Sequence, residues 1–420
     1  MSRPASPESG EGAFATAWPT TPLAMLTTKI GSGATPRGGA SVYLTSRVSH
    51  ALVRSQNVFD RHFDARDMAF ISPDHAAGLK GVELQAHDVL LNITGDGVTF
   101  GRACMVPADL LPACVNQHVA IVRANPALLH PGYLLAFLTH PIVKTYMESF
   151  NAGGSRRAMT KGHIESFRIP VPPMEIQTHI AGILSAYDDL IENCERRIRV
   201  LDEMARALYR ELFVGNARRV PAQQLIDDGI VEINDGYRAK NSELGETGLP
   251  FARAGNINDG FQFEDADLLA DANVPRAGTK ISRPLDVVFT SKGTVGRFAL
   301  VREGTPQFVY SPQLCFWRVL RRDKLSPHFL YRWMQSREFL DQVDGVKGST
   351  DMADYVSLTN QRRMLVRLPE PGDVARADRS LAPIDHLVGT LTDERANARR
   401  GRDLLLPRLL SGQLSVRDAA

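Results

Sequence analysis

The two halves of this chain repeat one another. Asp88-Val89-Leu90 recurs as Asp286-Val287-Val288, and Arg54-Ser55-Gln56-Asn57-Val58 recurs as Arg253-Ala254-Gly255-Asn256-Ile257. Further matches follow in the same order: Phe100-Gly101-Arg102 with Val295-Gly296-Arg297, Asn116-Gln117-His118 with Pro312-Gln313-Leu314, His130-Pro131-Gly132-Tyr133-Leu134 with Ser326-Pro327-His328-Phe329-Leu330, Gly154-Ser155 with Gly348-Ser349, and Ile169-Pro170 with Leu368-Pro369. A nearly constant interval of roughly 200 residues between short matches indicates a tandem duplication.

Each copy ends in a long apolar-periodic segment, which predicts two long helices over about 175–213 and 384–411. In the first helix, apolar residues recur every three or four positions, as in a coiled coil. About forty residues at ~1.5 Å each reach roughly 60 Å, which suits a strut better than a helix inside one domain. Pro407 is expected to interrupt the last turn of the second helix. The residues expected in the seam between the two helices are Ile180, Leu184, Tyr187, Ile191, Ile198, Leu201, Leu208, Leu387, Leu391 and Leu405.

The remaining segments predict two similar globular domains of mixed α/β (α+β) class. Short β-rich runs separated by Gly, Asp and Asn turns occupy both segments, and 128–150 and 327–342 look helical. The expected architecture has pseudo-twofold internal symmetry, with the domains separated by two long antiparallel helices that form a coiled coil. The expected boundaries are 1–17 (disordered tail), 18–172 (domain 1), 173–214 (central helix), 215–371 (domain 2), 372–413 (C-terminal helix) and 414–420 (tail).

Composition limits the function more by exclusion than by assignment. The chain has 420 residues, and 49 Lys+Arg against 47 Asp+Glu give a formal net charge of +2, so any nucleic-acid surface must come from local clustering of cations. Its four cysteines are scattered without a C-x-x-C pair, which argues against a disulfide scaffold and fits a cytoplasmic protein. No apolar run is long enough to cross a membrane, and the N-terminal residues do not resemble a signal peptide.

Common catalytic motifs are missing from the sequence. The Gly31-x-Gly33 and Gly95-x-Gly97 pairs lack the third glycine of a dinucleotide fingerprint, and no P-loop or H-E-x-x-H motif occurs. Ser155 is not in the setting of a nucleophile elbow, and Asp188-Asp189 reads as a solvated helix face. We therefore expect no metal and no cofactor in this chain.

Two similar domains on a rigid strut suit a long periodic ligand such as duplex DNA, whose major groove returns every ~34 Å. Basic residues on Gly-rich turns are the candidates for phosphate or guanine contacts, and amides beside them suit adenine edges. The basic candidates are Lys29, Arg37, Arg54, Arg102, Arg156, Arg157, Lys161, Arg238, Lys240, Arg253, Lys280, Lys292, Arg297 and Lys347; the amides are Gln56, Asn57, Asn116, Gln117, Asn256 and Gln313. For Arg102 and Arg297 a structural role is an equal alternative, and the recurring amides are equally suited to building turns.

The ordered set of motifs resembles the specificity (S) subunits of type I restriction–modification systems. The resemblance covers about residues 20–415. It is carried by Ile30-Gly31-Ser32-Gly33-Ala34-Thr35-Pro36, Arg54-Ser55-Gln56-Asn57-Val58, Gly101-Arg102, Asn116-Gln117, Gly153-Gly154-Ser155, Ile169-Pro170-Val171-Pro172-Pro173 and Leu409-Leu410-Ser411-Gly412. The entry to the second helix, Glu370-Pro371-Gly372-Asp373-Val374-Ala375, departs from the family's usual Glu-Gln pattern.

The resemblance implies a non-catalytic subunit with two target recognition domains, each reading half of a bipartite, asymmetric DNA target. Its helices would dock two modification (methyltransferase) subunits, and restriction (motor–nuclease) subunits would complete a complex that methylates DNA and defends against phage. S-adenosylmethionine, ATP and Mg²⁺ would belong to those partners. Two other classes of function remain open: a catalytic methyltransferase or nuclease, and a duplicated scaffold that binds RNA or protein.

Overall fold

A computed structural model describes residues 16–150, 157–212, 218–258, 260–346, 348–350 and 353–414. The chain divides into two compact units. Unit 1 comprises residues 1–191 and 397–420, and unit 2 comprises residues 192–396. The predicted tails, 1–17 and 414–420, lie almost wholly outside the described residues.

Unit 1 is built on a four-stranded antiparallel sheet in the order β2-β11-β7-β9. These strands are β2 (Thr27–Ser32), β11 (Val119–Ala124), β7 (Val89–Asn92) and β9 (Ala103–Met105). Every residue of β7 is buried, and alternate side chains enter different clusters: Val89 and Leu91 one, Leu90 the other. The sheet is therefore covered on both faces, as such a continuous apolar strand requires.

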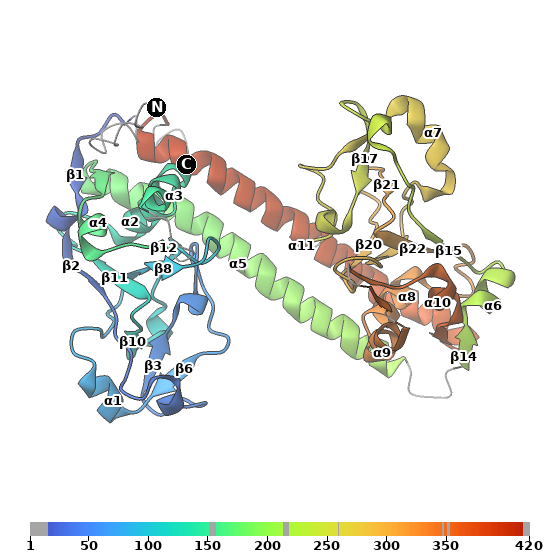
Figure 1. The fold of residues 1–420 in the computed structure, drawn as a ribbon, viewed down its shortest axis with the longest axis horizontal. Helices are drawn as coiled ribbons and strands as arrows, with labels where there is room; N and C mark the ends of the chain where they lie inside the picture. Colours follow the sequence, from blue (N-terminus) through green and yellow to red (C-terminus); the bar gives the residue numbers. More distant parts are fainter. Residues whose placement is uncertain are drawn as a thin grey trace. The chain divides into compact units, whose positions relative to one another are not determined.

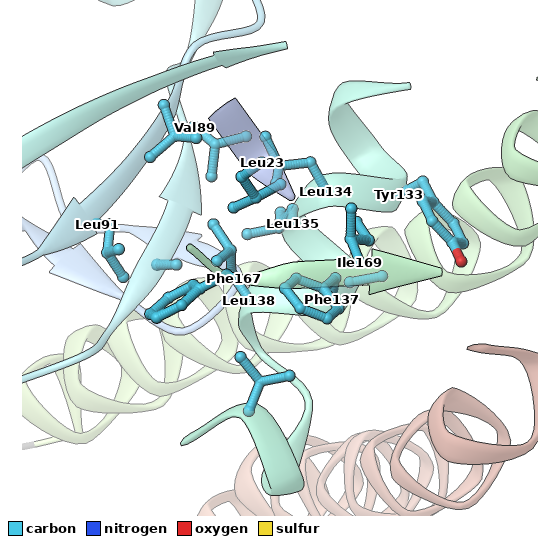
Figure 2. Close-up of a cluster of buried hydrophobic side chains, with 14 of the residues drawn as sticks. Leu23, Val89, Leu91, Tyr133, Leu134, Leu135, Phe137, Leu138, Phe167 and Ile169 are labelled. Atoms are coloured by element: carbon cyan, nitrogen blue, oxygen red, sulfur yellow. The ribbon is translucent and has the colours of Figure 1, made fainter. Parts of the chain in front are cut away.

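Helices cover one face of this sheet. They are α2 (Pro131–Leu138), α3 (Pro141–Ser149), α4 (Lys161–Glu165) and the first part of α5 (Met174–Glu211), with the pair β1 (Thr20–Pro22) and β13 (Arg168–Pro170) beside them. Figure 2 shows side chains of α2 converging with Val89 and Leu91 from the sheet and with Phe167 and Ile169. The other face packs on a smaller sheet, β10 (Ala113–Val115), β3 (His50–Val53) and β6 (Ala69–Ile71), and on α1 (Pro73–Gly78).

Unit 2 repeats this plan. Its sheet has the order β15-β22-β19-β20, formed by β15 (Val231–Asp235), β22 (Leu314–Val319), β19 (Val287–Thr290) and β20 (Phe298–Leu300). One face packs on α8 (Pro327–Met334), α9 (Arg337–Val346) and α10 (Leu358–Arg363), beside α6 (Ala222–Asp227) and the pair β14 (Arg218–Pro221) and β25 (Leu365–Leu368).

The other face of the unit 2 sheet packs toward β16 (Leu244–Gly245), β18 (Leu268–Ala270), β17 (Gly248–Ala252), β21 (Val309–Tyr310) and α7 (Val274–Ala277). In Figure 1, β17 and β21 lie on one side of β20 and β22, and α8 and α10 lie on the other. The strand orders of the two central sheets correspond strand by strand, which confirms the predicted internal repeat.

Two of the predicted helical runs are broken. Residues 128–150 form α2 and α3, and residues 327–342 fall in α8 and α9. The first break comes at Pro141, whose ring disfavours helical backbone in the preceding residue. His140 adopts an extended conformation there, and its Nδ1 accepts a hydrogen bond from the backbone N–H of Ile142 (3.1 Å). In unit 2 the hydroxyl of Ser336 plays the same capping role, accepting from the N–H of Phe339 (3.4 Å).

The second long helix begins earlier than its apolar spacing indicated. α11 spans Pro371–Ser411, so the start near residue 384 that the apolar spacing indicated is wrong, whereas the expected boundary at residue 372 lies within one residue of the observed start. Proline is tolerated in the first turn of a helix, where its missing N–H has no partner in any case. The helix also continues through Pro383 and Pro407. Packing of Leu381, Ile384 and Leu406 into the two cores offsets the hydrogen bonds that these prolines remove.

In both long helices, core-facing positions recur at alternating steps of three and four residues. The same interval in sequence separates each position of the α5 repeat from its counterpart in α11. In α5 the repeat is Gln177, Ile180, Leu184, Tyr187, Ile191, Cys194, Ile198, Leu201, Ala205 and Leu208; in α11 it is Val374, Ala377, Leu381, Ile384, Val388, Leu391, Arg395, Ala398, Arg402 and Leu405. Leu387 falls outside this repeat and is exposed, so its place in the predicted seam is wrong. Because Arg395 and Arg402 occupy two positions of the α11 repeat, a search for apolar residues does not detect the repeat there.

Within each unit the two helices run antiparallel. In unit 1, Ile180 and Leu184 share a core with Leu406, Leu409 and Leu410. In unit 2, Tyr209 and Leu212 share a core with Ala377 and Leu381, and Arg376 pairs with Glu211 at 2.9 Å. No described helix is long and apolar enough to cross a membrane.

Asp188 is not the solvated residue that its sequence suggested. Its carboxylate accepts from Arg61 Nε (2.7 Å), and Arg402 Nη1 lies 2.8 Å away on α11. Asp385 occupies the equivalent place on α11 and binds Arg332 and His328 of α8. Each unit is thus joined to its helix pair through a buried or half-buried acid at the same repeat position.

Candidate nucleic-acid interface

In unit 1, several loops meet at one edge of the central sheet. Strand β2 ends there, β7 ends there and β11 begins there, because β11 runs antiparallel to both neighbours. We call this edge end surface 1 and define it as residues 33–37, 54–57, 94–101, 116–118 and Arg157. Its loops are joined by hydrogen bonds: Thr94 Oγ1 lies 2.6 Å from His118 Nδ1, and Asn92 Nδ2 donates to the carbonyls of Ser55 (2.9 Å) and Thr99 (3.1 Å).

Unit 2 has an equivalent edge, end surface 2, formed by residues 236–240, 253–257, 291–297, 311–313 and 354–356. The N–H of Tyr237 donates to the carbonyl of Tyr310 (2.7 Å), and the N–H of Ala254 donates to Gln313 Oε1 (3.1 Å). The N–H of Gly293 donates to the carbonyl of Asp354 (2.9 Å). The same topological position in each unit therefore gathers the same set of loops.

A buried ion pair fixes the strands behind each end surface. In unit 1, Arg123 on β11 donates from Nε (2.6 Å) and Nη2 (2.8 Å) to the carboxylate of Asp88, which has no exposed side-chain surface. In unit 2, Arg318 on β22 donates from Nε and Nη2, both at 2.7 Å, to the buried Asp286. The recurring aspartates thus serve the scaffold, and the bidentate geometry ties neighbouring strands together.

The recurring Arg–Asn motif builds the same turn twice. Asn57 Oδ1 accepts from the N–H of Arg54 (3.1 Å), and its Nδ2 donates to the carbonyl of Asp64 (2.9 Å). Asn256 Oδ1 accepts from the N–H of Arg253 (2.8 Å), and its Nδ2 donates to the carbonyl of Gln262 (3.0 Å). Both asparagines are turn-building residues, as the alternative interpretation expected.

Several candidate cations of unit 1 already have partners. Lys29 donates to the carbonyl of Gly81 and lies on β2, away from the end surface; burial is the main cause of its lowered pKa. Arg54 donates to the carbonyl of Asp67, and the Arg102 guanidinium lies 4.3 Å from the centre of the Phe59 ring. Arg157 pairs with Glu148 (3.1 Å).

The exposed side chains of end surface 1 are fewer. Of the candidate residues on this surface, Arg37, Gln56 and Gln117 are exposed, and the hydroxyl of Thr35 donates to Gln117 Oε1. Asn116 is buried, and its Oδ1 accepts from the N–H of His118 (3.1 Å). Lys161 lies on α4, outside this surface, and pairs with Glu165. Arg156 lies outside the described residues.

End surface 2 presents more exposed cations. Arg238, Lys240 and Lys292 are exposed, and Arg297 uses Nη1 to hold the carbonyls of Ala254 and Ile257, each at 3.3 Å. Arg253 is half-exposed and pairs with Asp267. The amine of Lys280 lies 2.9 Å from Asp235 and 2.8 Å from the carbonyl of Gly236, which makes it a part of the scaffold. Lys347 lies outside the described residues.

The sequence interpretation missed the arginines that complete these networks. Arg123 and Arg318 repeat at the common interval and could have been found as a further match. Arg61 could not, because its partner Asp188 is distant in sequence and Arg61 has no counterpart in the repeat. Among the described residues, no three His, Cys, Asp or Glu side chains are grouped to hold a metal ion.

Comparisons with known proteins agree with this architecture. A family model described as the type I restriction modification DNA specificity domain matches residues 71–203. The type I restriction enzyme MjaVIII specificity subunit of Methanocaldococcus jannaschii is 21% identical over 358 residues, covering 81% of this chain and 82% of the relative. The MjaIX specificity subunit of the same organism is 22% identical over 305 residues, covering 68% of this chain and 69% of the relative.

The fold also has a solved relative. The crystal structure of a type I restriction–modification S subunit from M. genitalium aligns with a TM-score of 0.63 at 11% identity, over 96% of this chain and 97% of that one. The matched specificity domain and the relatives that span most of the chain point to the same family. Over most of its length the chain is similar to specificity subunits of type I restriction–modification systems, and residues 71–203 match their DNA specificity domain.

Proposed function

We propose that this chain is a non-catalytic DNA-recognition subunit whose end surfaces 1 and 2 each read one half of a bipartite, asymmetric duplex target. One observation carries the proposal: the same edge of the same sheet, in both units, presents exposed polar and cationic side chains on loops held by a buried scaffold. The exposed residues differ between the units, with Arg37, Gln56 and Gln117 on one and Arg238, Lys240 and Lys292 on the other.

The exposed side chains can make two kinds of contact with DNA, to phosphates and to base edges. Exposed Arg and Lys neutralise phosphates, and arginine can also bind a guanine edge with two hydrogen bonds. Glutamine amides can bind an adenine edge in the same bidentate way. Because the scaffold arginines already hold internal carboxylates or carbonyls, the readout falls to the side chains that remain exposed.

Adenine methylation would take place on partner subunits. In this proposal the helices α5 and α11 dock two modification subunits, which supply S-adenosylmethionine, and restriction subunits supply ATP and Mg²⁺ chemistry. Base flipping by the methyltransferase would give it access to the target adenine.

Co-expression tests the proposal. The chain is expressed with a type I modification subunit in a host that lacks other adenine methylation, and methylated adenines are mapped across the genome. The expected result is one bipartite motif that appears only when both chains are present. Methylation by this chain alone, or purified chain that prefers RNA to duplex DNA, would contradict it.

Single-cation variants give a quantitative form of the same test. Lys292→Ala should lower duplex affinity and reduce the slope of log affinity against log salt by about 0.9, the value for one lost phosphate contact. Lys324→Ala is the matched control, because Lys324 is an exposed lysine of unit 2 on the turn that follows β22, whereas end surface 2 precedes that strand. Equal effects of the two substitutions would count against end surface 2.

A further inference from the structure

Val98 stands out on end surface 1 because it is apolar and 69% exposed. It lies in the loop that follows β8 (Thr94–Gly95), between Gly97 and Thr99. Isolated exposed valines are common and by themselves mean little. The reason to consider Val98 is its place among the loops assigned to DNA recognition.

The loop that carries Val98 is held in shape before any ligand binds. Asp96 Oδ1 accepts from the N–H of Val98 (3.1 Å), from the N–H of Thr99 (2.9 Å) and from the Thr99 hydroxyl (2.9 Å). These bonds to Thr99 and Val98 lower the pKa of Asp96, so the carboxylate stays ionised and keeps its three donors. The carbonyl of Thr99 is in turn held by buried Asn92.

The base of the loop is also fixed. Strand β8 pairs with β12 (Arg157–Ala158), placing Gly95 opposite Arg157, and Arg157 is anchored on Glu148 at 3.1 Å. The backbone on both sides of Val98 is therefore constrained, and its side chain is held out in water. A preformed loop loses little conformational entropy when it binds, which favours its use in recognition.

Duplex DNA offers few apolar groups to such a side chain. Along the major groove, base edges present hydrogen-bond donors and acceptors, and the C5 methyl of thymine is the apolar exception. Contact with that methyl would remove both surfaces from water and would discriminate a T·A pair from the other base pairs.

On the basis of the proposed function, we infer that Val98 is a specificity-determining residue that packs on the C5 methyl of a thymine in the half-site read by unit 1. The equivalent loop of unit 2 carries Lys292, Gly293, Thr294 and Arg297 at its exposed positions. This loop has no exposed aliphatic side chain, so the thymine contact belongs to the first half-site and has no counterpart in the second.

Deoxyuridine substitution tests this inference directly. The target is first mapped with the full chain and its modification subunit, and duplexes are then made in which each thymine of both half-sites is replaced in turn by deoxyuridine, which lacks only the C5 methyl. One position in one half-site should bind the wild-type complex about fourfold more weakly, as expected for one methyl group no longer buried.

The variants supply the second arm. Val98→Ala should abolish most of the deoxyuridine penalty at that position and relax the methylated motif there, while leaving the other half-site unchanged. Val98→Thr, which keeps one methyl group, should retain part of the penalty. Val48→Ala is the matched control, because Val48 is 70% exposed and precedes β3, whereas end surface 1 follows that strand.

The outcomes separate the inference from the function on which it rests. If wild type methylates a bipartite target but no deoxyuridine position is sensitive, or if Val98→Ala keeps the full penalty, the Val98 inference is wrong and the recognition function stands. If no bipartite target is found, both the Val98 inference and the proposed recognition function are wrong. Unchanged melting of Val98→Ala and Val48→Ala would show that neither substitution acts through folding.

Discussion

Units 1 and 2 share a scaffold and differ at the surface that the scaffold supports. The sheet order, the buried Asp–Arg pair and the Asn-centred turn are the same in both units. The exposed side chains of the end surfaces are different, with Val98 in one place and Lys292 in the other. The comparison teaches which repeated residues build the fold, because a residue buried in the same contact in both units cannot distinguish two half-sites.

The anchors to the long helices are equivalent in position and different in chemistry. Asp188 holds Arg61 and Arg402, whereas Asp385 holds Arg332 and His328. Arg332 has a second acid, Asp202 on α5, at 2.8 Å. Arg61 has the Thr139 hydroxyl at 3.2 Å instead. The two anchors should therefore respond differently when the shared acid is neutralised.

The largest expected effect is at Asp188, the acid that joins unit 1 to its long helices. Asp188→Asn should destabilise unit 1 by about 3–5 kcal/mol, because it leaves the buried Arg61 without a carboxylate. Asp385→Asn should cost unit 2 only about 1–3 kcal/mol, because Arg332 keeps Asp202. Hydrogen exchange, analysed separately for peptides of each unit, measures both losses. A larger loss of stability for Asp385→Asn than for Asp188→Asn would contradict the expected difference between the two units.

The second expected effect is at the scaffold pairs. Asp286→Asn should destabilise unit 2 by about 2–4 kcal/mol, since Arg318 is almost fully buried, its remaining carboxylate partner Glu232 lies farther away at 3.3 Å, and the Tyr310 hydroxyl also donates to Asp286 (2.8 Å). Asp88→Asn should cost unit 1 about 1–2 kcal/mol, because Arg123 keeps one-fifth of its side chain in water and can be hydrated. Urea unfolding of the full chain with unit-specific probes checks the order, and equal losses would show that exposure of the arginine does not matter.

The third effect depends on pH and on a difference in capping residues. His140 caps α3 in unit 1, where Ser336 caps α9 in unit 2. Burial lowers the pKa of His140 from 6.5 to about 4. As pH falls, His140 is therefore protonated in the unfolded chain before it is protonated in the folded chain. The stability that neutral His140 contributes is complete above pH 6.5 and is lost as pH falls toward 4.

At pH 5 the loss from His140 should be about 2 kcal/mol in unit 1. His140→Ser, which copies the cap of unit 2, should remove most of this acid sensitivity without changing stability at pH 8 by more than about 1 kcal/mol. Hydrogen exchange at pH 5 and pH 8 compares the two proteins. The same acid loss in His140→Ser as in wild type would assign the effect to other groups.

The repeat and the first long helix were predictable because both are periodic in sequence. Matches such as Arg54–Asn57 with Arg253–Asn256 align two copies without any knowledge of structure, and apolar spacing defined α5 over nearly its full length. The start of α11 was not predictable in this way. Its repeat includes Arg395 and Arg402, and Pro383 lies within it, so the apolar pattern is interrupted where the helix is not.

The side-chain roles were less accessible from sequence. Basic residues on Gly-rich turns could not be distinguished by sequence. In the folded chain Lys29, Arg54 and Lys280 bind carbonyls or carboxylates, whereas Arg37 and Arg238 are exposed. Those internal contacts are made with residues that are distant in sequence. Residue type therefore predicted which side chains could bind DNA, and only the fold shows which of them remain available.

Exchange of one unit's recognition segment tests the central claim most directly. Residues 18–172 are replaced by the corresponding segment of another specificity subunit, the hybrid is expressed with its modification subunit, and methylated adenines are mapped. The account predicts a hybrid motif in which one half-site is new and the other half-site is that of the original protein. A motif altered in both halves, or in neither, would contradict the claim that each unit reads its own half of the target.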